Sequence, residues 1–396
     1  MVCRSVKVEN FRNIESCDVS FSDGVNILVG DNAQGKTNLL EAIYFTALGK
    51  SFRPAKEAEL VRFGEEAAYI KNSFRDSIRD QNISVRLFSS RSRRVVEQNG
   101  VKISKMSELV GAFKVVLFCP EHLSLIQGGP ELRRNYLNVA LSQLRPVYLR
   151  SLQRYNQILK ERNSLIKKAE EDMKTFRDTI DFWSEQLAAE AAVISSIRAD
   201  YVKRAGGYVS DIFEDMTASF GESDERGRRE IPSLEYHSVI TKHLDIDEGD
   251  SVGVFELFSD VETVRKKYTE LLTTRYEREI AAGSTLYGIH RDDIKIDINS
   301  RPARLFASQG QQRSLALAMK LAEGSISARE SGGDMPVFLF DDVLSELDSH
   351  RRAYLMKNME SRQVIMTTCE LDPKIEVYSH GAELIGVKNG VYANLR

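Results

Sequence analysis

The fold of this chain is decided by one stretch of eight residues, Gly30-Asp31-Asn32-Ala33-Gln34-Gly35-Lys36-Thr37, which matches the pattern G-x-x-x-x-G-K-[ST] in full. In such a loop the glycines let successive backbone N–H groups turn towards phosphate oxygens at the positive end of the following helix. Lys36 adds a positive charge for the β- and γ-phosphates, and Thr37 offers a hydroxyl to Mg²⁺.

The residues on both sides of this loop favour phosphate binding over a glycine turn that binds nothing. Val25–Val29 is almost continuously apolar, which predicts a buried central strand. Lys36–Leu48 carries apolar residues at helical spacing, and Gly49 follows as a stop signal. A strand, a glycine loop and a helix in this order predict a nucleotide-binding P-loop.

A second apolar strand, Val337–Phe340, ends in the carboxylates Asp341 and Asp342. Beside a P-loop, a carboxylate at the end of a strand lies where Mg²⁺ needs an anionic ligand, so we expect Asp341 to bind the metal together with Thr37. Asp342 would then face the attacking water. An Asp-Asp pair taken alone is more often a helix cap, but two adjacent carboxylates are costly without a cation or exposure, and the P-loop favours the metal site.

A polar stretch, Ser308-Gln309-Gly310-Gln311-Gln312-Arg313, precedes the strongly helical run Ser314–Ser327. Small residues and amides before a helix form a second start suited to phosphate. An ordinary polar N-cap is the alternative, and taken alone it is the better interpretation. One chain therefore offers two phosphate-binding helix starts for one nucleotide. If both act, we expect them to act across a dimer.

The chain between the two halves of this α/β pattern has a different distribution of apolar residues. After Pro146, apolar residues recur at spacings of three and four, which predicts long amphipathic helices paired as a hairpin with its tip at Lys167–Lys174. Phe220–Asp250 is predicted to be a mobile connection, and Val261–Ile280 another helix. We therefore predict an α/β head made of residues 1–146 and 284–396, interrupted by an α-helical insertion over residues 147–283.

Composition limits the class of protein. The chain has 396 residues, with 55 Lys and Arg against 58 Asp and Glu, a formal net charge of −3 and a pI near 6.2, which excludes a basic tail protein. It has no run of about 18 apolar residues, no apolar segment at its start and no Cys-x-x-Cys pair, so we expect a cytoplasmic protein with free thiols and no membrane contact.

Basic clusters could contact a phosphate backbone, although most such pairs on helices are simply solvated. They are Arg91, Arg93 and Arg94; Arg133 and Arg134; Arg226, Arg228 and Arg229; Lys266 and Lys267; and Arg351 and Arg352.

The set and order of these motifs resembles the ABC-type ATPase heads of the SMC and recombination-repair class, and within that class the RecF family of DNA replication and repair proteins. The resemblance rests on Asn10-Phe11-Arg12-Asn13, Gly30 through Tyr44, Ser51-Phe52-Arg53, Phe118-Cys119-Pro120-Glu121, His290-Arg291-Asp292-Asp293, Ser308 through Arg313, and Asp341 through Asp348. One departure from ABC ATPases is that their switch histidine has no counterpart at Thr367-Thr368-Cys369.

The resemblance implies ATP and Mg²⁺ as cofactors and slow, switch-type hydrolysis of ATP. It implies a short-armed head that closes as an ATP-dependent homodimer on duplex DNA near single-strand junctions. Its role would be gap repair and replication restart with RecO and RecR, helping RecA to load where SSB coats single strands.

The resemblance also assigns roles to residues. Asp342 and Lys36 would be catalytic, and Asp341 and Thr37 would bind the metal. Arg12, Asn13 and Asn38 would join Gly30, Asp31, Asn32, Ala33, Gln34, Gly35, Lys36 and Thr37 in binding ATP; Ser308, Gln309, Gly310, Gln311 and Gln312 would contact the γ-phosphate held by a partner chain; and Ser345 to Asp348 would form the D-loop.

Other classes fit the sequence less well. A GTPase switch would need an Asn-Lys-x-Asp motif, and the chain has no Asn-Lys pair. The ATPase subunit of a transporter would lack the long insertion over residues 147–283. An ATPase subunit of another assembly and a structural scaffold that does not hydrolyse ATP remain as alternatives.

Overall fold

The computed structural model describes residues 1–90, 94–220, 230–241, 251–369 and 381–395. The chain divides into two compact units. Unit 1 comprises residues 1–124, 215–222 and 316–396, and unit 2 comprises residues 125–214 and 223–315. The proposed boundaries of the insertion, at residues 146/147 and 283/284, stay a prediction.

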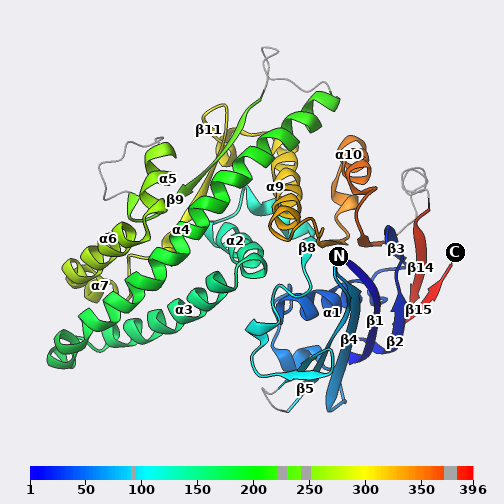
Figure 1. The fold of residues 1–396 in the computed structure, drawn as a ribbon, viewed down its shortest axis with the longest axis horizontal. Coiled ribbons are helices and arrows are strands. Elements are labelled where there is room, and N and C mark those ends of the chain that lie inside the picture. The colour runs from blue at the N-terminus through cyan, green and yellow to red at the C-terminus, as the bar shows by residue number, and fades with distance from the viewer. Residues whose placement is uncertain (91–93, 221–229, 242–250, 370–380, 396) are drawn as a thin grey trace. The chain divides into compact units, whose positions relative to one another are not determined.

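Unit 1 contains a mainly parallel sheet with strands from both ends of the chain (Figure 1). The apolar runs before the P-loop and before the two aspartates form its interior strands, as predicted. Its order is β15-β14-β3-β13-β12-β8, and only β15 runs antiparallel to its neighbour. The strands are β3 (Val25–Val29), β8 (Val115–Phe118), β12 (Val337–Asp341), β13 (Val364–Thr368), β14 (Glu383–Lys388) and β15 (Val391–Asn394).

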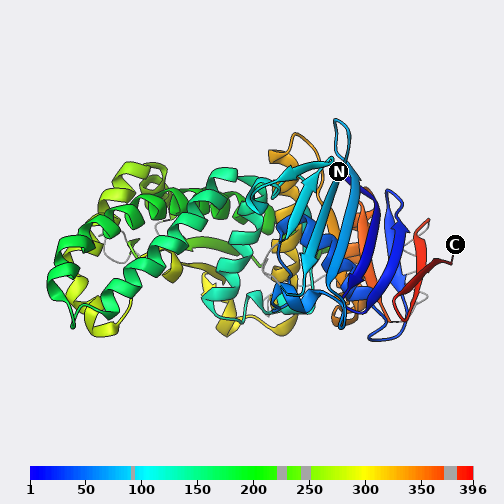
Figure 2. The ribbon, with the colours of Figure 1, turned by 90° about the horizontal axis from the view of Figure 1, so that it is seen from below.

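A second sheet of unit 1 is wholly antiparallel, with the order β2-β1-β4-β5-β6-β7 (Figure 2). Strands β6 and β7 are joined at Asn99-Gly100, where both residues have the positive φ angles, 52° and 78°, of a tight two-residue turn. The strands are β1 (Val2–Phe11), β2 (Ile14–Ser20), β4 (Ala67–Arg75), β5 (Asp80–Phe88), β6 (Val95–Gln98) and β7 (Val101–Ile103).

Helix α1 (Lys36–Leu48) contacts strands of both sheets, β1 and β4 on one side and β12 and β13 on the other. A helix covered on two sides is buried almost all round. This position explains why even Lys36 and Glu41 are buried. The other helices of unit 1 are η1 (Glu57–Leu60), η2 (Met106–Glu108), η3 (Pro120–Leu125), η6 (Leu344–Glu346), α10 (Ser349–Met359) and most of α9 (Gln309–Glu330).

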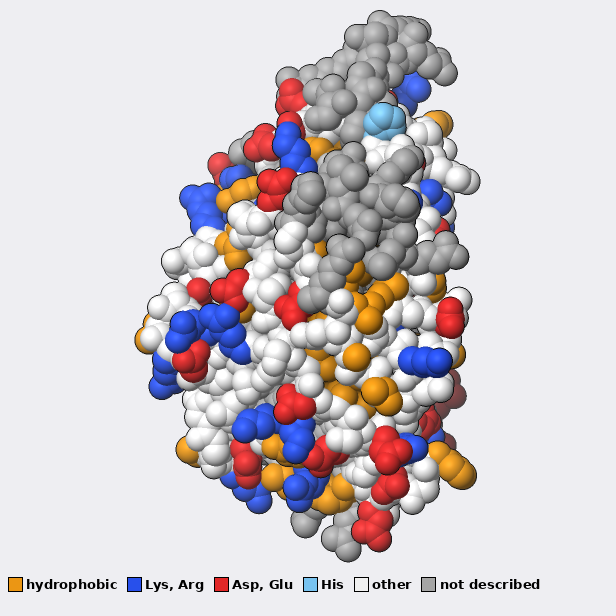
Figure 3. Space-filling model, turned by 90° about the vertical axis from the view of Figure 1, so that its right-hand side faces the viewer, with side chains coloured by type: hydrophobic (Ala, Val, Ile, Leu, Met, Phe, Trp, Pro, Cys, Tyr) orange, Lys and Arg blue, Asp and Glu red, His pale blue; other side chains and the backbone are white. Residues whose placement is uncertain are grey.

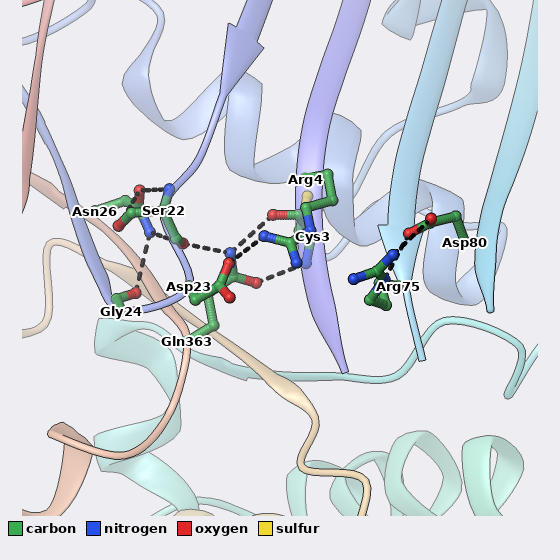
Figure 4. Close-up of polar contacts among 9 residues, drawn as sticks. All are labelled: Cys3, Arg4, Ser22, Asp23, Gly24, Asn26, Arg75, Asp80 and Gln363. Atoms are coloured by element: carbon green, nitrogen blue, oxygen red, sulfur yellow. Dashed lines mark hydrogen bonds and ion pairs between the residues drawn. The ribbon is translucent and has the colours of Figure 1, made fainter. Parts of the chain in front are cut away.

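Two buried amide side chains link the sheets of unit 1 (Figure 4). The Gln363 amide accepts a hydrogen bond of 2.7 Å from the N–H of Cys3 in β1 and donates to the carbonyls of Cys3 and Ser22. Asn26 in β3 donates to the carbonyls of Ser22, Gly24 and Val364. Because both amides satisfy backbone groups that would otherwise be buried without partners, they fix how the sheets join.

Unit 2 consists of helices and one small sheet. The predicted helical hairpin is confirmed: α3 (Pro146–Lys167) and α4 (Met173–Phe220) meet at a tip where Ile166, Phe176 and Ile180 pack together. Among its described residues the unit also contains α2 (Pro130–Leu144), α5 (Ser251–Ser259), α6 (Val261–Thr274), α7 (Tyr276–Ala282), η5 (Ile289–Arg291), α8 (Ala303–Phe306) and the strands β9 (Pro232–His237), β10 (Asp293–Ile298) and β11 (Arg301–Pro302).

The predicted connection over residues 220–250 is wrong in one part. Strand β9 lies within it and pairs antiparallel with β10 from Pro232 to His237. A six-residue strand with mixed burial has little periodicity, so the sequence resembled a loop. Most of the rest of that interval lies outside the described residues.

No helix in the described part of the chain is both long enough and apolar enough to cross a membrane.

Candidate nucleotide-binding site

The loop Gly30–Gly35 leaves β3 and enters α1 through two residues with positive φ, Ala33 (63°) and Gly35 (115°). Two of its positions accept only glycine. A Cβ atom at Gly30 would lie 2.2 Å from the carbonyl oxygen of Val387, and one at Gly35 would lie 3.1 Å from the side-chain oxygen of Asn13. The loop therefore has the conformation and the close surroundings that its glycines predict.

Lys36 folds back over this loop. Its Nζ atom donates to the carbonyl of Gly30 and, over 2.7 Å, to the carbonyl of Asp31. The side chain is only 7% exposed. The lysine is thus held among the groups of the loop itself, and its charge lies where the motif predicts a phosphate.

Thr37 and Asp341 are brought together by the order of the strands. Because β3 and β12 both pair with β13, the ends of these three strands are adjacent. The Thr37 hydroxyl donates to Oδ1 of Asp341 over 2.7 Å, and the Thr367 hydroxyl donates to the same oxygen over 3.0 Å. Burial raises the pKa of Asp341, and these two hydrogen bonds oppose the rise.

Asp342 follows in a left-handed conformation, with φ 51°. Its N–H donates to the Thr367 hydroxyl over 2.9 Å, and its carbonyl accepts from the hydroxyl of Ser345 over 2.7 Å. Asp348 accepts from the N–H groups of His350 and Arg351 and so caps α10. Ser345 and Asp348 are both exposed.

Beside the loop lies a polar cluster centred on Glu41, whose side chain is fully buried. Arg12 donates to both of its oxygens, over 3.1 Å and 2.8 Å, and Arg53 and Ser51 also donate to it. Burial alone would raise the pKa of Glu41, but the hydrogen bonds from Arg12, Arg53 and Ser51 outweigh it and lower the pKa. The carboxylate therefore stays ionised and holds two guanidinium groups in place.

A chain of amides connects this cluster to the P-loop. Arg53 donates to the Asn38 side chain over 2.5 Å, Asn38 donates to Asn13 over 2.7 Å, and Asn13 donates to the carbonyl of Ala33 over 3.1 Å. These residues border an open cavity of about 600 Å³. Its lining is Arg12, Asn13, Asn38, Arg53, Ala58, Glu59, Val61, Arg62, Phe63, Gly64, Glu65 and Ser89.

The predicted second helix start lies in unit 2. Ser308 and Gln311 form a capping box at the start of α9: the Gln311 N–H donates to the Ser308 hydroxyl over 3.2 Å, and the Ser308 N–H donates to the Gln311 side chain over 2.6 Å. Gln312 is buried and donates to the carbonyls of Ala303 and Ala307. Ser308 and Gln309 are exposed, and Gly310 is half-buried.

Several basic clusters are engaged within the fold. Arg133, only 5% exposed, donates to both carboxylate oxygens of Asp293, over 2.7 Å and 2.9 Å. Arg94 pairs with Glu57, and Arg351 is buried against Asp348. Arg133 and Arg351 are buried in ion pairs, so the idea that they contact a phosphate backbone is wrong for these two. Arg94 is part exposed, and for it the contact stays a prediction. Arg91, Arg93, Arg226, Arg228 and Arg229 lie outside the described residues.

The sequence reasoning gave no role to Thr367, Glu41 or Arg53 and did not single out the turn between β14 and β15. The three residues lie in stretches that the resemblance or its departure had marked, whereas the turn had no signal. Oxygen donors that fit Mg²⁺ do meet at the loop, namely the Thr37 hydroxyl and the Asp341 carboxylate. The described residues contain no cluster of three or more His, Cys, Asp or Glu side chains suited to a metal, so water and phosphate oxygens would complete its shell.

Comparison with known proteins gives a consistent result. The family model for the RecF/RecN/SMC N terminal domain matches residues 2–390. DNA replication and repair protein RecF from Bacillus cereus (strain G9842) is 34% identical over 391 residues, 98% of each chain, and the RecF of Bacillus thuringiensis (strain Al Hakam) matches to the same extent.

Solved structures agree with these matches. The recombination mediator protein RecF-ATPrS of the RecFOR pathway has a TM-score of 0.87 at 32% identity, over 100% of this chain and 98% of that one. An Smc head bound to the C-winged helix domain of ScpA has a TM-score of 0.54 at 15% identity, over 100% of this chain and 97% of that one, which shows a shared fold alone. The chain has the α/β fold of a P-loop ABC-type ATPase head with a helical second lobe, and it belongs to the RecF family of DNA replication and repair proteins.

Proposed function

We propose that this protein is an ATP-driven switch of recombinational gap repair and replication restart, which closes as a homodimer on duplex DNA near single-strand junctions. The observation that carries the proposal is the contact between Thr37 of the P-loop and Asp341 at the end of β12. It joins the phosphate-binding loop to a buried carboxylate, as ATP hydrolysis requires. Solved relatives described as RecF-ATP and RecF-ATPrS support ATP as the nucleotide.

Each group of the site has a role in this proposal. The N–H groups of Gly30–Thr37 and the ammonium of Lys36 bind the phosphates. The phosphate oxygens then replace the loop carbonyls as acceptors of the hydrogen bonds from Lys36. Thr37 and Asp341 would hold Mg²⁺, which would neutralise negative charge on the phosphates. Asp342 orients or deprotonates the attacking water, and the products are ADP and phosphate.

The cavity beside the P-loop supplies the remaining contacts. Arg12, Asn13 and Asn38 line it. Arg12 donates to Glu41 of α1, Asn13 donates to the carbonyl of Ala33 in the loop, and Asn38, which belongs to α1, donates to Asn13. A space of about 600 Å³ accommodates a nucleoside. We therefore assign the ribose and the base of ATP to this cavity.

Dimerisation follows from the second helix start. Ser308 and Gln309 are exposed at the positive end of α9, so they are accessible to a γ-phosphate carried by another chain. Gly310 allows close approach, Gln311 stabilises the helix start, and Gln312 fixes the preceding segment through Ala303 and Ala307. Ser345 and Asp348 are exposed next to Asp342 and would complete the interface as the D-loop.

The charge pattern suits a switch that binds DNA only when closed. Lys and Arg side chains are interspersed with Asp and Glu side chains on the face that Figure 3 shows. With a net charge of −3, a single chain should hold DNA weakly, and closure of two heads would combine their basic residues. By analogy with relatives of the RecFOR pathway, RecO and RecR would be partners, and the outcome would be RecA loading onto SSB-coated single strands.

The test is size-exclusion chromatography with light scattering, with and without ATP and Mg²⁺, together with ATPase assays with and without duplex DNA. We expect ATP to convert wild-type monomers to dimers that retain duplex DNA, and Lys36→Arg to abolish both effects. Lys7→Arg, at an exposed lysine of β1, is the matched control. A wild-type chain that stays monomeric with ATP and shows no response to DNA would contradict the proposal.

A further inference from the structure

The C-terminal hairpin, defined here as β14, β15 and the turn Asn389-Gly390 between them, contacts two consecutive residues of the P-loop. The N–H of Gly390 donates to the carbonyl of Gln34 over 2.8 Å, and the N–H of Asn389 donates to the Gln34 side chain over 2.6 Å. The hydroxyl of Tyr392 donates to the carbonyl of Gly35 over 2.9 Å.

These contacts determine the direction of the N–H groups that bind phosphate. In a planar trans peptide the C=O of one residue and the N–H of the next point in opposite directions. A Gln34 carbonyl bonded to the hairpin therefore turns the Gly35 N–H away from the hairpin. In the same way, the Gly35 carbonyl bonded to Tyr392 orients the N–H of Lys36.

The hydroxyl of Tyr392 is well suited to this task. Burial raises the pKa of Tyr392, so the hydroxyl stays protonated and remains a donor. The strand that carries it lies at the edge of the parallel sheet and is paired to β14 through Tyr392 and Val387. Val387 also provides the carbonyl that excludes a side chain at Gly30.

The turn of the hairpin lies against Asn13, a residue that holds the P-loop from its other side. Asn13, which holds the carbonyl of Ala33, has its own backbone oxygen 3.0 Å from where a Cβ atom at Gly390 would lie. Turns from the two ends of the chain thus hold successive residues of one loop, Ala33 from one side and Gln34 and Gly35 from the other.

We propose that the C-terminal hairpin is part of the nucleotide site, and that Tyr392 is a positioning residue that orients the peptide groups of the P-loop for phosphate binding. This inference rests on the proposed binding of ATP at Gly30–Thr37. It adds that the affinity for ATP is set in part by residues more than 350 positions further along the chain.

The first test removes one hydroxyl. Tyr392→Phe should raise KM and Kd for ATP by about three- to tenfold, which is what one neutral hydrogen bond supplies, and leave kcat at saturating ATP unchanged. Tyr354→Phe is the matched control, because the Tyr354 hydroxyl also makes a 2.9 Å hydrogen bond in unit 1, to Asp215. The control should leave KM and Kd for ATP unchanged.

The second test uses the turn. Gly390→Ala should weaken ATP binding, because φ is +76° and the new methyl group presses on Asn13. Gly100→Ala is the matched control. Gly100 follows Asn99 in the same kind of hairpin turn and has φ +78°, but the new methyl group would meet nothing within 4 Å. It carries the same backbone strain at a site away from the loop.

The outcomes separate the inference from the function it rests on. Weaker ATP binding in Tyr392→Phe and Gly390→Ala, with both controls at the wild-type value, supports the inference. Equal ATP affinity in all four variants and in the wild type overturns it, and so does an equal loss in variants and controls. Failure of the wild-type chain to bind ATP would instead overturn the proposed function.

Discussion

The hydroxyl of Thr37 donates a 2.7 Å hydrogen bond to Asp341, a residue 304 positions away along the chain. The pair connects the helix that follows the P-loop with the strand that carries the two carboxylates. If both side chains hold Mg²⁺, Thr37→Val, which keeps the shape but loses the hydroxyl, should remove most of the dependence of ATP affinity on Mg²⁺.

Titration of a fluorescent ATP analogue with Mg²⁺ or with EDTA measures this dependence. Thr37→Ser, which retains a hydroxyl, serves as the control and should behave like the wild type. The same Mg²⁺ dependence in Thr37→Val and in the wild type would argue against the assignment.

Asp342→Asn should trap the ATP-bound dimer. The substitution keeps the size of the side chain, and asparagine tolerates the positive φ of 51°, so the fold should be unaffected. Only the carboxylate that would act on water is lost. A dimer lifetime in ATP at least tenfold longer than that of the wild type, measured by size-exclusion after dilution, is the expected result. Rapid dissociation would count against a catalytic Asp342.

Glu41→Gln should destabilise unit 1 and weaken ATP binding together. It leaves Arg12 and Arg53 without their shared carboxylate. Breaking a fully buried pair costs about 3–5 kcal/mol, and the loss here should be smaller because both arginine side chains are part exposed. Denaturant unfolding at pH 7 measures the loss. Glu15→Gln, at an exposed partner of Arg62, should change little, and an equally small effect at Glu41 would refute the role given to the cluster.

The cluster also predicts the sign of a pH effect. Because the folded pKa of Glu41 is lowered, its stabilisation is present above the unfolded pKa of a glutamate and is lost as the pH falls through the folded pKa. Glu41→Gln should therefore unfold with a weaker dependence on pH in the acid range than the wild type.

His290 predicts a separate loss of stability at mildly acidic pH. Burial lowers the pKa of His290 to about 4 from 6.5, and the neutral ring accepts from the Tyr155 hydroxyl while its other nitrogen donates to the Thr285 carbonyl. Between these two pH values the unfolded chain binds more protons, so the free energy of unfolding falls as the pH drops, by up to about 3 kcal/mol.

Unfolding of His290→Gln at pH 7 and pH 5 tests this expectation. The variant should lose less stability between the two values than the wild type does. His350→Gln, at an exposed position on α10, should retain the wild-type difference. An unchanged difference in His290→Gln would exclude this histidine as the source.

The elements around the P-loop could be predicted because each is encoded locally. Continuous apolar runs marked β3 and β12, and the helical spacing after Gly35 marked α1 from Lys36 to Leu48. Thr37 could be assigned because it is the last residue of the G-x-x-x-x-G-K-[ST] motif, and Asp341 because it directly follows an apolar strand. Local sequence was sufficient wherever one segment contained both the pattern and the chemistry.

The remaining parts of the site depend on contacts that no local pattern encodes. Tyr392 is 357 positions from Gly35, and a tyrosine in an edge strand has no signature of its own. Glu41 resembles an ordinary helical glutamate, and only the packing of α1 against two sheets buries it. Arg133 resembled a DNA contact until its pairing with Asp293 placed it in the interior.

The central claim is that one ATP is bound by the P-loop of one chain and by Ser308 of another. Mixing two inactive variants, Lys36→Arg and Ser308→Arg, tests it most directly, because a mixed dimer has one site with an intact P-loop and an intact Ser308. Neither variant alone forms an intact site, so a mixed dimer is the only pair in which one ATP can be bound by both chains, and the mixture should regain ATPase activity that neither variant shows alone. A mixture no more active than the average of the two variants would contradict the claim.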